Sequence, residues 1–297
     1  MPQDDQAWTT FFQAAQRDSR VGDLLLLAEE APSDRERVES HRTAGMHLME
    51  DGRFGLAREQ FEAALRIAPA DVTSRKYLNK LAELVSESSQ EAGRATLIPS
   101  WQPRLIFLFT GHMIDKKGRS EPRFPPDKEP IAADAIARTL QEQGAGPEDL
   151  AICGGACGGD LLFTEACLTR GLRLFLYLPL QESAFLAASV NFEKDGTGLA
   201  GDNWEARYFT AKNHRLTRVW VTPDDLGPPP EEGNPYARNN LRQLYTALSY
   251  GPEKLRVVAL WNGQGGDGPG GTEHMIQQAQ ARGGKTIIID TKEAFGL

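Results

Sequence analysis

The stretch Cys153-Gly154-Gly155-Ala156-Cys157-Gly158-Gly159-Asp160 decides the expected fold of this chain. It follows a short apolar run at 150–152 and opens an amphipathic, helix-like run at 161–170. A glycine-rich turn between a strand and a helix lets backbone N–H groups approach an anion, and the positive end of the helix dipole points at the same place. The stretch therefore predicts a strand, an anion-binding turn and a helix.

Two further glycine turns follow strand-like runs, at Thr110-Gly111-His112 and at 261–272. The carboxyl ends of parallel strands share one edge of a sheet, so we expect all three turns to meet there, as in nucleotide-binding α/β proteins. A simpler interpretation stays open for both. Gly111 gives a tight exit beside a surface histidine, and the longer run is a flexible loop before a helix that begins at the N-cap Thr272.

Short apolar runs alternate with helical patterns beyond residue 103, which predicts an α/β fold with a Rossmann-like, doubly wound, mostly parallel sheet. The predicted strands are 104–109, 150–153, 173–178, 217–221, 256–261 and 286–290. The predicted helices are 130–143, 161–170, 183–191, 204–214, 237–250 and 272–281. Two long proline-containing loops, 115–127 and 222–235, are typical of lids or binding segments.

The first ninety residues carry a helical pattern only, and residues 38–71 match the tetratricopeptide pattern, whose period is about 34 residues. Its small, aromatic and terminating positions are filled by Gly45, Ala57, Phe61, Ala64 and Pro69. Small residues let two antiparallel helices approach, and a proline stops the second one. Residues 77–85 would stack on this pair. An ordinary helical hairpin is the alternative, and either structure is a packing or docking module.

The totals are consistent with a soluble protein of about two domains. We expect an all-helical domain at 1–90, a linker at 91–103 and a nucleotide-binding domain at 104–297. Hydrophobic residues make up 40% and charged residues 25% of the chain, which suits a globular core. No apolar run approaches the roughly 20 residues that cross a bilayer, and the amino terminus lacks a secretion signal. We therefore expect a cytoplasmic protein without membrane contact.

The net charge of −8 and the absence of a clustered Lys/Arg run argue against binding of nucleic acid. A small phosphorylated ligand remains compatible, since local dipoles and a few arginines decide such a contact. Three cysteines make no disulfide framework, and Cys153 and Cys157 have no second Cys/His pair at zinc-ligand spacing. No metal and no separate cofactor are expected.

Several side chains are candidates for ligand contact. Asp160 either caps the first turn of its helix, worth about 1 kcal/mol, or accepts a hydrogen bond from a ribose hydroxyl. His112 would project over the sheet edge, although a histidine without a visible partner is weak evidence for catalysis. Arg123 and Arg238 lie in proline-containing segments and suit phosphate, unless they are ordinary surface arginines.

At these residues the chain resembles the SLOG superfamily, the Rossmann-like domains grouped with Smf/DprA and the Lonely-Guy enzymes. The resemblance spans about 104–291 and rests on the three glycine turns and on Leu178-Pro179 after the third strand. With the helical region it is similar to the TPR-S type, a helical-repeat and sensor module linked to bacterial conflict and signalling systems. The resemblance implies recognition of a nucleotide-derived messenger, ADP-ribose-like or cyclic, and coupling to a protein partner or effector through the helical domain. It also allows a homo-oligomer.

The same resemblance supplies an alternative function. Lonely-Guy enzymes cleave an N-glycosidic bond with a Pro-Gly-Gly-x-Gly-Thr-x-x-Glu block, whereas this chain has Pro269-Gly270-Gly271-Thr272-Glu273, and Met275 stands where the carboxylate belongs. An oxocarbenium-like centre needs a nearby carboxylate, for which Asp160, Glu165 or Glu273 are substitutes. The main expectation is binding without catalytic residues. The alternative is an N-glycosidase acting on a nucleoside monophosphate or NAD.

We expect phosphate to bind the N–H groups of 154–159 and 270–272 and ribose to bind Asp160. Residues 110–112 would form a wall of the crevice. The predicted ligand-binding residues are Thr110, Gly111, His112, Arg123, Gly154, Gly155, Ala156, Gly158, Gly159, Asp160, Arg238, Trp261, Asn262, Gly263, Gly270, Gly271, Thr272 and Glu273.

Overall fold

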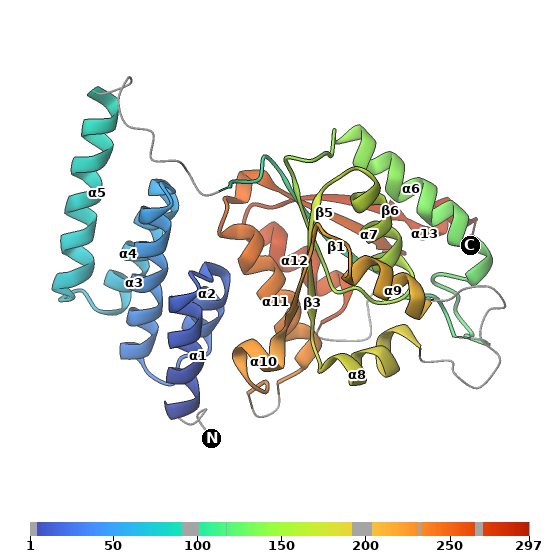
Figure 1. Cartoon of the computed structure of the whole chain (residues 1–297), viewed down its shortest axis with the longest axis horizontal. Coiled ribbons are helices and arrows are strands. Elements are labelled where there is room, and N and C mark those ends of the chain that lie inside the picture. The colour runs from blue at the N-terminus through green and yellow to red at the C-terminus, as the bar shows by residue number, and fades with distance from the viewer. Residues whose placement is uncertain are drawn as a thin grey trace.

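The computed structural model describes residues 5–90, 101–116, 118–191, 204–230, 233–264 and 270–296. Within them a helical region precedes an α/β region built on one six-stranded sheet (Figure 1). The helical region consists of α1 (Asp5–Arg17), α2 (Val21–Glu29), α3 (Asp34–Glu50), α4 (Phe54–Ile67) and α5 (Val72–Gln90). None of the helices in the described ranges combines the length and the apolar character that crossing a lipid bilayer requires.

All strands of the sheet run parallel in the order β4-β3-β2-β1-β5-β6, which confirms the predicted Rossmann-like α/β fold. The strands are β1 (Ile106–Gly111), β2 (Leu150–Cys153), β3 (Arg173–Leu178), β4 (Thr217–Val221), β5 (Leu255–Trp261) and β6 (Lys285–Asp290). Only β1 starts two residues later than predicted. The reason is Asp149, whose carboxylate accepts the Leu105 N–H at 3.0 Å and a guanidinium N–H of Arg104 at 2.6 Å.

Helices cover both faces of the sheet, as right-handed crossovers require. One face carries α6 (Glu129–Glu142), α7 (Gly159–Thr169), α9 (Trp204–Lys212) and α13 (Thr291–Phe295); the other carries α11 (Pro235–Leu248) and α12 (Thr272–Ala281). Side chains of β1 alternate between the two cores, with Phe107 and Phe109 on the first face and Ile106 and Leu108 on the second. The chain therefore winds away from β1 in both directions.

The connections differ from the predictions in three places. Residues predicted as a loop after β4 begin with a helix, α10 (Thr222–Leu226), which has a proline and two acidic residues in its first turn and buries Leu226. The predicted helix 183–191 is α8 (Glu182–Phe185) continued by a π-helical turn, η2 (Leu186–Val190). The short helix α13 was not predicted; the Asp290 side chain caps it. Two 3₁₀ turns, η1 (Pro126–Lys128) and η3 (Pro252–Lys254), complete the described elements.

The helical region contains the predicted pair of packed helices. A Cβ on Gly45 of α3 would lie 2.8 Å from the Phe61 ring of α4, so only glycine permits this approach. Tyr77 of α5 stacks on the same ring at 5.3 Å, and α5 thereby adds a third helix to the pair. The tetratricopeptide assignment stays a prediction. Residues 91–100 of the expected linker lie outside the described ranges.

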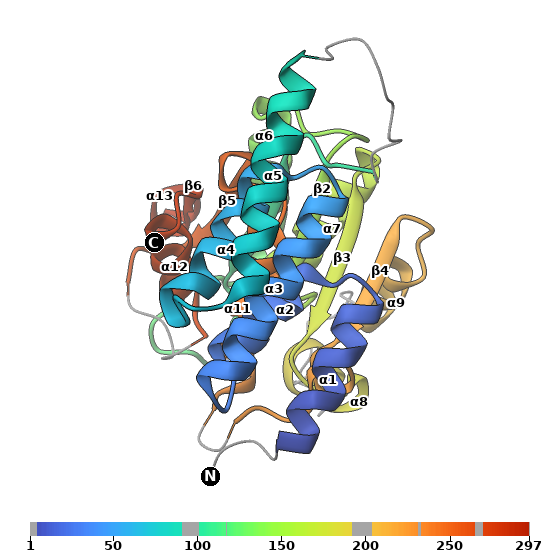
Figure 2. The same cartoon turned by 90° about the vertical axis from the view of Figure 1, so that its left-hand side faces the viewer.

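The helical region packs directly on α11. Leu226 and Tyr245 of the α/β region belong to the same hydrophobic cluster as Trp8, Phe12 and Leu24 of the helical region. Figure 1 shows α11 between the sheet and α2, and Figure 2 shows the helical region from its outer side, in front of the α/β region. One helix therefore touches the sheet on one side and the amino-terminal helices on the other.

Candidate functional site

A cavity of about 360 Å³ opens at the carboxyl ends of the strands, beside the point where the strand order reverses between β1 and β5. Ligands of open α/β sheets bind at this position. Segments from all three glycine turns line the cavity, together with the start of α11. The predicted residues in its wall are Thr110, Gly111, His112, Arg123, Gly154, Ala156, Asp160, Gly270, Gly271 and Thr272.

The turn after β2 is filled from within the protein, which corrects the prediction of phosphate on the N–H groups of 154–159. Asp160 bends back from α7, and its Oδ2 accepts the Ala156 N–H at 3.2 Å, with further backbone hydrogen bonds from Gly155 and Gly154. The Cys157 N–H donates to the Ser189 carbonyl at 2.9 Å. A carboxylate of the chain itself therefore occupies the anion-binding turn.

Asp160 also does not cap α7, contrary to one of its two predicted roles. The helix begins at Gly159, and the residue before it is Gly158, without a side-chain cap. Burial raises the pKa of the Asp160 carboxyl to about 7, against the opposing effect of the N–H groups of Ala156, Gly155 and Gly154. A carboxyl group that changes charge near neutral pH therefore stands in the cavity wall.

Gly158 and Gly159 serve packing and do not line the cavity. Gly158 has a φ of +85°, and a Cβ on it would lie 2.6 Å from the Ile114 nitrogen. A Cβ on Gly159 would lie 3.0 Å from the Phe109 ring, and the Gly159 N–H donates to the His112 carbonyl at 3.2 Å. These glycines let the loop after β1 approach the start of α7. Close packing therefore explains two of the glycines that the sequence analysis assigned to ligand binding.

His112 connects the loops after β1 and β5. Its ring is buried, and the Asn262 N–H donates to its Nε2 at 3.3 Å. Burial, aided by the positive charge of Arg123, lowers the pKa of His112 to about 4. The ring is therefore neutral at pH 7 and holds the rim together. Its partner Asn262 is not among the residues that line the cavity, and neither are Trp261 and Gly263. Trp261 donates its indole N–H to the Gln264 carbonyl at 2.7 Å.

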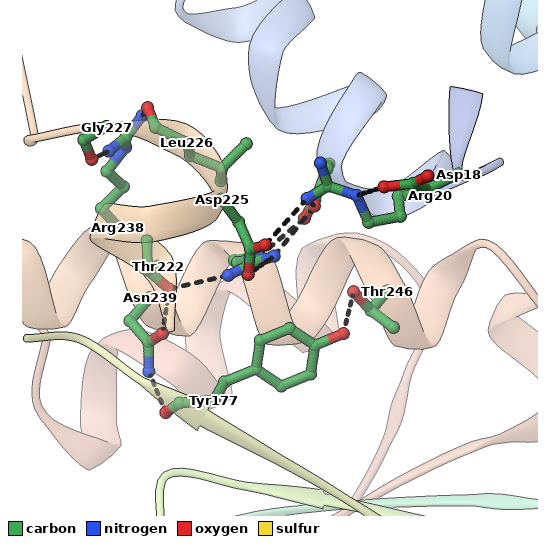
Figure 3. Close-up of polar contacts among 12 residues, drawn as sticks. Asp18, Arg20, Tyr177, Thr222, Asp225, Leu226, Gly227, Arg238, Asn239 and Thr246 are labelled. Carbon is green, nitrogen blue, oxygen red and sulfur yellow. Dashed lines mark hydrogen bonds and ion pairs between the residues drawn. The ribbon is translucent and has the colours of Figure 1, made fainter. Parts of the chain in front are cut away.

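Arg238 lies outside the cavity wall, which corrects its predicted role in ligand contact. Its guanidinium is buried and donates to both oxygens of Glu30 at 2.7 Å. It also donates to the carbonyls of Leu226 and Gly227 (Figure 3) and to that of Pro228. Sequence alone gave no sign of this, because Glu30 is 208 positions away.

The start of α11 contributes cavity residues that are absent from the predicted ligand-binding residues: Asn234, Tyr236, Asn239, Asn240 and Gln243. Asn239 and Asn240 follow Tyr236 by three and four positions, and Gln243 follows them by four and three, which places these residues on one face of the helix. Asn240 donates to the Gly270 carbonyl at 2.7 Å and so ties α11 to the turn after β5. Asn239 is used internally, between the Thr222 hydroxyl and the Tyr177 carbonyl (Figure 3).

The turn after β5 leads into α12, and Thr272 is its first residue instead of its cap. Gly271 precedes the helix and provides no side-chain cap. The Thr110 hydroxyl lies 3.4 Å from the Thr272 hydroxyl, so both line the same side of the cavity. Glu273 points elsewhere, toward Gln277. Residues 265–269 of this predicted turn lie outside the described ranges.

The fold and the site define a Rossmann-like α/β protein with a polar cavity at the reversal of its strand order. No family model matches the chain, and no curated protein shows significant similarity to it. In the described parts of the chain, no three His, Cys, Asp or Glu side chains are grouped so that they could hold a metal ion. The chemistry of the cavity is therefore the basis for a functional proposal.

Proposed function

We propose that this protein is a sensor that binds a small nucleotide-derived signal in the cavity and does not consume it. The observation that carries the proposal is the start of α12. Of the helices that begin around the cavity, α11 is capped by Asn234, and the first N–H of α7 donates to the His112 carbonyl. At α12 the preceding residue is a glycine without a side-chain cap, so the positive end of this dipole suits an anion.

The surroundings of this helix start support phosphate as the anion. The hydroxyls of Thr110 and Thr272 lie on the same side of the cavity, and Arg123 brings a positive charge to the wall. Charge-assisted hydrogen bonds to phosphate are stronger than neutral ones, and a guanidinium matches phosphate geometry. The phosphate expected at 270–272 therefore remains part of the proposal, and the phosphate expected at 154–159 does not.

Helix α11 gives the sensor a route to the helical region. Tyr236, Asn240 and Gln243 line the cavity from this helix. Arg238 and Arg242, on the same helix, bind acidic residues of the amino-terminal region. A ligand that shifts α11 would therefore change the contacts with the helical region, through which we propose that a protein partner or effector is engaged. By its resemblance to TPR-S proteins, we place this sensor in bacterial defence signalling in the cytoplasm.

One observation favours a second function, hydrolysis of an N-glycosidic bond. Asp160 stands in the cavity wall with a pKa of about 7, and a carboxyl that exchanges a proton near neutral pH suits acid–base chemistry at a sugar. The same residue binds three backbone N–H groups, which fix it and occupy part of its lone pairs. Turnover would make the protein an enzyme acting on a nucleoside monophosphate or NAD.

A thermal-shift screen with nucleoside mono- and diphosphates, cyclic nucleotides, NAD and ADP-ribose tests the proposal. Thr272→Val removes one hydroxyl at the α12 start and keeps the volume, so we expect binding to weaken about 3- to 30-fold. Thr210→Val changes an exposed threonine on α9 that donates to a backbone carbonyl, and it should leave binding unchanged. Absence of any shift in the wild-type protein would contradict nucleotide binding.

Chromatography of the same mixtures separates the two functions. A sensor returns its ligand intact after hours of incubation, whereas a glycosidase releases free base. Asp160→Asn should then abolish release while keeping an acceptor oxygen for the Ala156 N–H. Release that persists in Asp160→Asn would contradict a role for this carboxyl.

A further inference from the structure

The side chain of Gln243 is a buried polar group without a partner. Only 2% of the residue is exposed, and that surface faces the cavity, whose wall it joins. Its carboxamide makes no hydrogen bond among the described residues, although its neighbours on α11, Asn239 and Asn240, are both bonded within the protein. The amide atoms of Gln243 are not among the fully enclosed side-chain atoms that lack a partner, so they reach the open space of the cavity. Such a group is explained by a partner that arrives with a ligand.

Gln243 and Asp160 belong to the same patch of the wall. A Cβ built on Gly154 would lie 2.9 Å from Asp160 Oδ2 and 4.0 Å from Gln243 Nε2. The patch therefore combines a carboxylate, which accepts, with a carboxamide, which both donates and accepts. Two neighbouring hydroxyls complement this combination, because each hydroxyl donates one hydrogen bond and accepts others.

The position of the patch selects the sugar of a nucleotide. Gly154 and Asp160 follow β2, whereas the start of α12 follows β5, and β1 lies between these strands. Adjacent strands are about 4.8 Å apart, so the two loops are separated by roughly 10 Å. With phosphate at α12, this distance brings the adjoining ribose to the patch, whereas the base lies beyond the ribose.

We propose that Gln243, with Asp160, holds the 2′- and 3′-hydroxyls of a ribose and makes the site selective for ribonucleotides over 2′-deoxyribonucleotides. The proposal rests on the proposed nucleotide binding and adds a specificity-determining residue to it. It assigns Gln243 a role that the folded protein without ligand does not need. Replacing it by an apolar side chain of similar size should therefore remove the selectivity and leave the fold intact.

The test measures affinities of the full chain for matched pairs, ADP with 2′-deoxy-ADP and GDP with 2′-deoxy-GDP, and for inorganic pyrophosphate as a sugar-free probe. For at least one pair we expect the ribose form to bind about tenfold more tightly, the effect of one good hydrogen bond. In Gln243→Leu the ratio should fall to within about twofold, while pyrophosphate binding and the melting temperature should stay as in the wild-type protein. Gln243→Met repeats the measurement with an unbranched side chain.

Gln277→Leu is the matched control, because it makes the same change at an exposed glutamine of α12 and should alter neither ratio nor melting temperature. Equal binding of both sugars by the wild-type protein overturns this inference and leaves the proposed function standing. A lower melting temperature with weaker pyrophosphate binding in both Gln243 variants shows a structural role and also overturns it. If neither pyrophosphate nor any nucleotide binds, the proposed function fails and the inference fails with it.

Discussion

Asp160 is the residue whose protonation should be visible in stability. Its pKa rises from 3.8 to about 7 on folding, so between these values the folded protein binds a proton that the unfolded chain has released. Stability contributed by this group is therefore complete below pH 4 and is lost as the pH rises to 7. Since the carboxyl partly faces the cavity, the loss is on the order of 1–3 kcal/mol.

Asp160→Asn should show no such loss. Urea unfolding at pH 5 and pH 8 measures the free energy of unfolding of wild type and Asp160→Asn. Relative to wild type, the variant should be more stable at pH 8 than at pH 5 by about 1–3 kcal/mol. Thr210→Val, at an exposed threonine of α9, serves as the control and should keep the wild-type pH dependence. A constant difference between wild type and Asp160→Asn at the two pH values would contradict a raised pKa.

Gly158 and Gly263 give a second comparison at the scale of single residues. Both have a positive φ, +85° and +72°, but a Cβ on Gly158 would collide with the Ile114 backbone, whereas no atom of the described residues lies within 4 Å of a Cβ on Gly263. Gly263→Ala should cost about 1 kcal/mol from strain alone, and Gly158→Ala at least 2–3 kcal/mol. Urea unfolding of the two variants measures the difference. If the two variants lose the same free energy of unfolding, the loop after β1 moves away from the new Cβ at position 158, which contradicts the prediction.

At the scale of elements, α11 is held to the helical region by buried charges. Arg242 is fully buried and donates to both oxygens of Asp23 at 2.7 and 2.9 Å and to Asp225 at 2.9 Å. The negative charge of Asp23 raises the pKa of Arg242, so the guanidinium stays charged despite its burial. Arg20, which Figure 3 also draws, adds a second cation, with its Nη1 3.6 Å from Asp225 Oδ1. Such a network stabilises only while every charge keeps its partner.

Arg242→Met should therefore destabilise the protein by about 3–5 kcal/mol, because it leaves the Asp23 carboxylate buried without its main partner. Arg37→Met removes an exposed pair with Asp34 and should cost less than about 0.5 kcal/mol. Chemical unfolding of both variants measures the two costs. Adding Asp23→Leu to Arg242→Met should restore part of the loss, and a purely additive loss would contradict the pairing.

The elements themselves were largely predictable, and their side-chain partners were not. Each of the six strands is a short apolar run, and the alternation of these runs with helical patterns located them. The helix α10 was not predicted, because its five residues, Thr222 to Leu226, are too few to show a helical repeat of apolar positions. The glycine turns met at one edge as the parallel sheet required, but nothing in the spacing showed that Asp160 turns back into its own loop. The pairing of Arg238 with Glu30 depends on tertiary packing across 208 positions.

At the scale of the whole molecule, the cavity, α11 and the helical region form one continuous structure. Asn240 ties α11 to the turn after β5, Tyr245 joins the hydrophobic cluster of the helical region, and Arg238 and Arg242 bind Glu30 and Asp23. The α/β region and the helical region are thus not structurally independent. Unfolding of the full chain should occur as a single transition in which both parts are lost together.

The buried arginines Arg238 and Arg242 also constrain how the sequence of this protein can evolve. An amino-terminal region taken from another protein would need acidic residues at the positions of Asp23 and Glu30. Without them, the buried guanidinium groups of Arg238 and Arg242 would lose their charged partners. Replacement at either acid should be inherited together with replacement of the matching arginine. In relatives of this chain, positions 23 with 242 and 30 with 238 should accordingly vary as pairs.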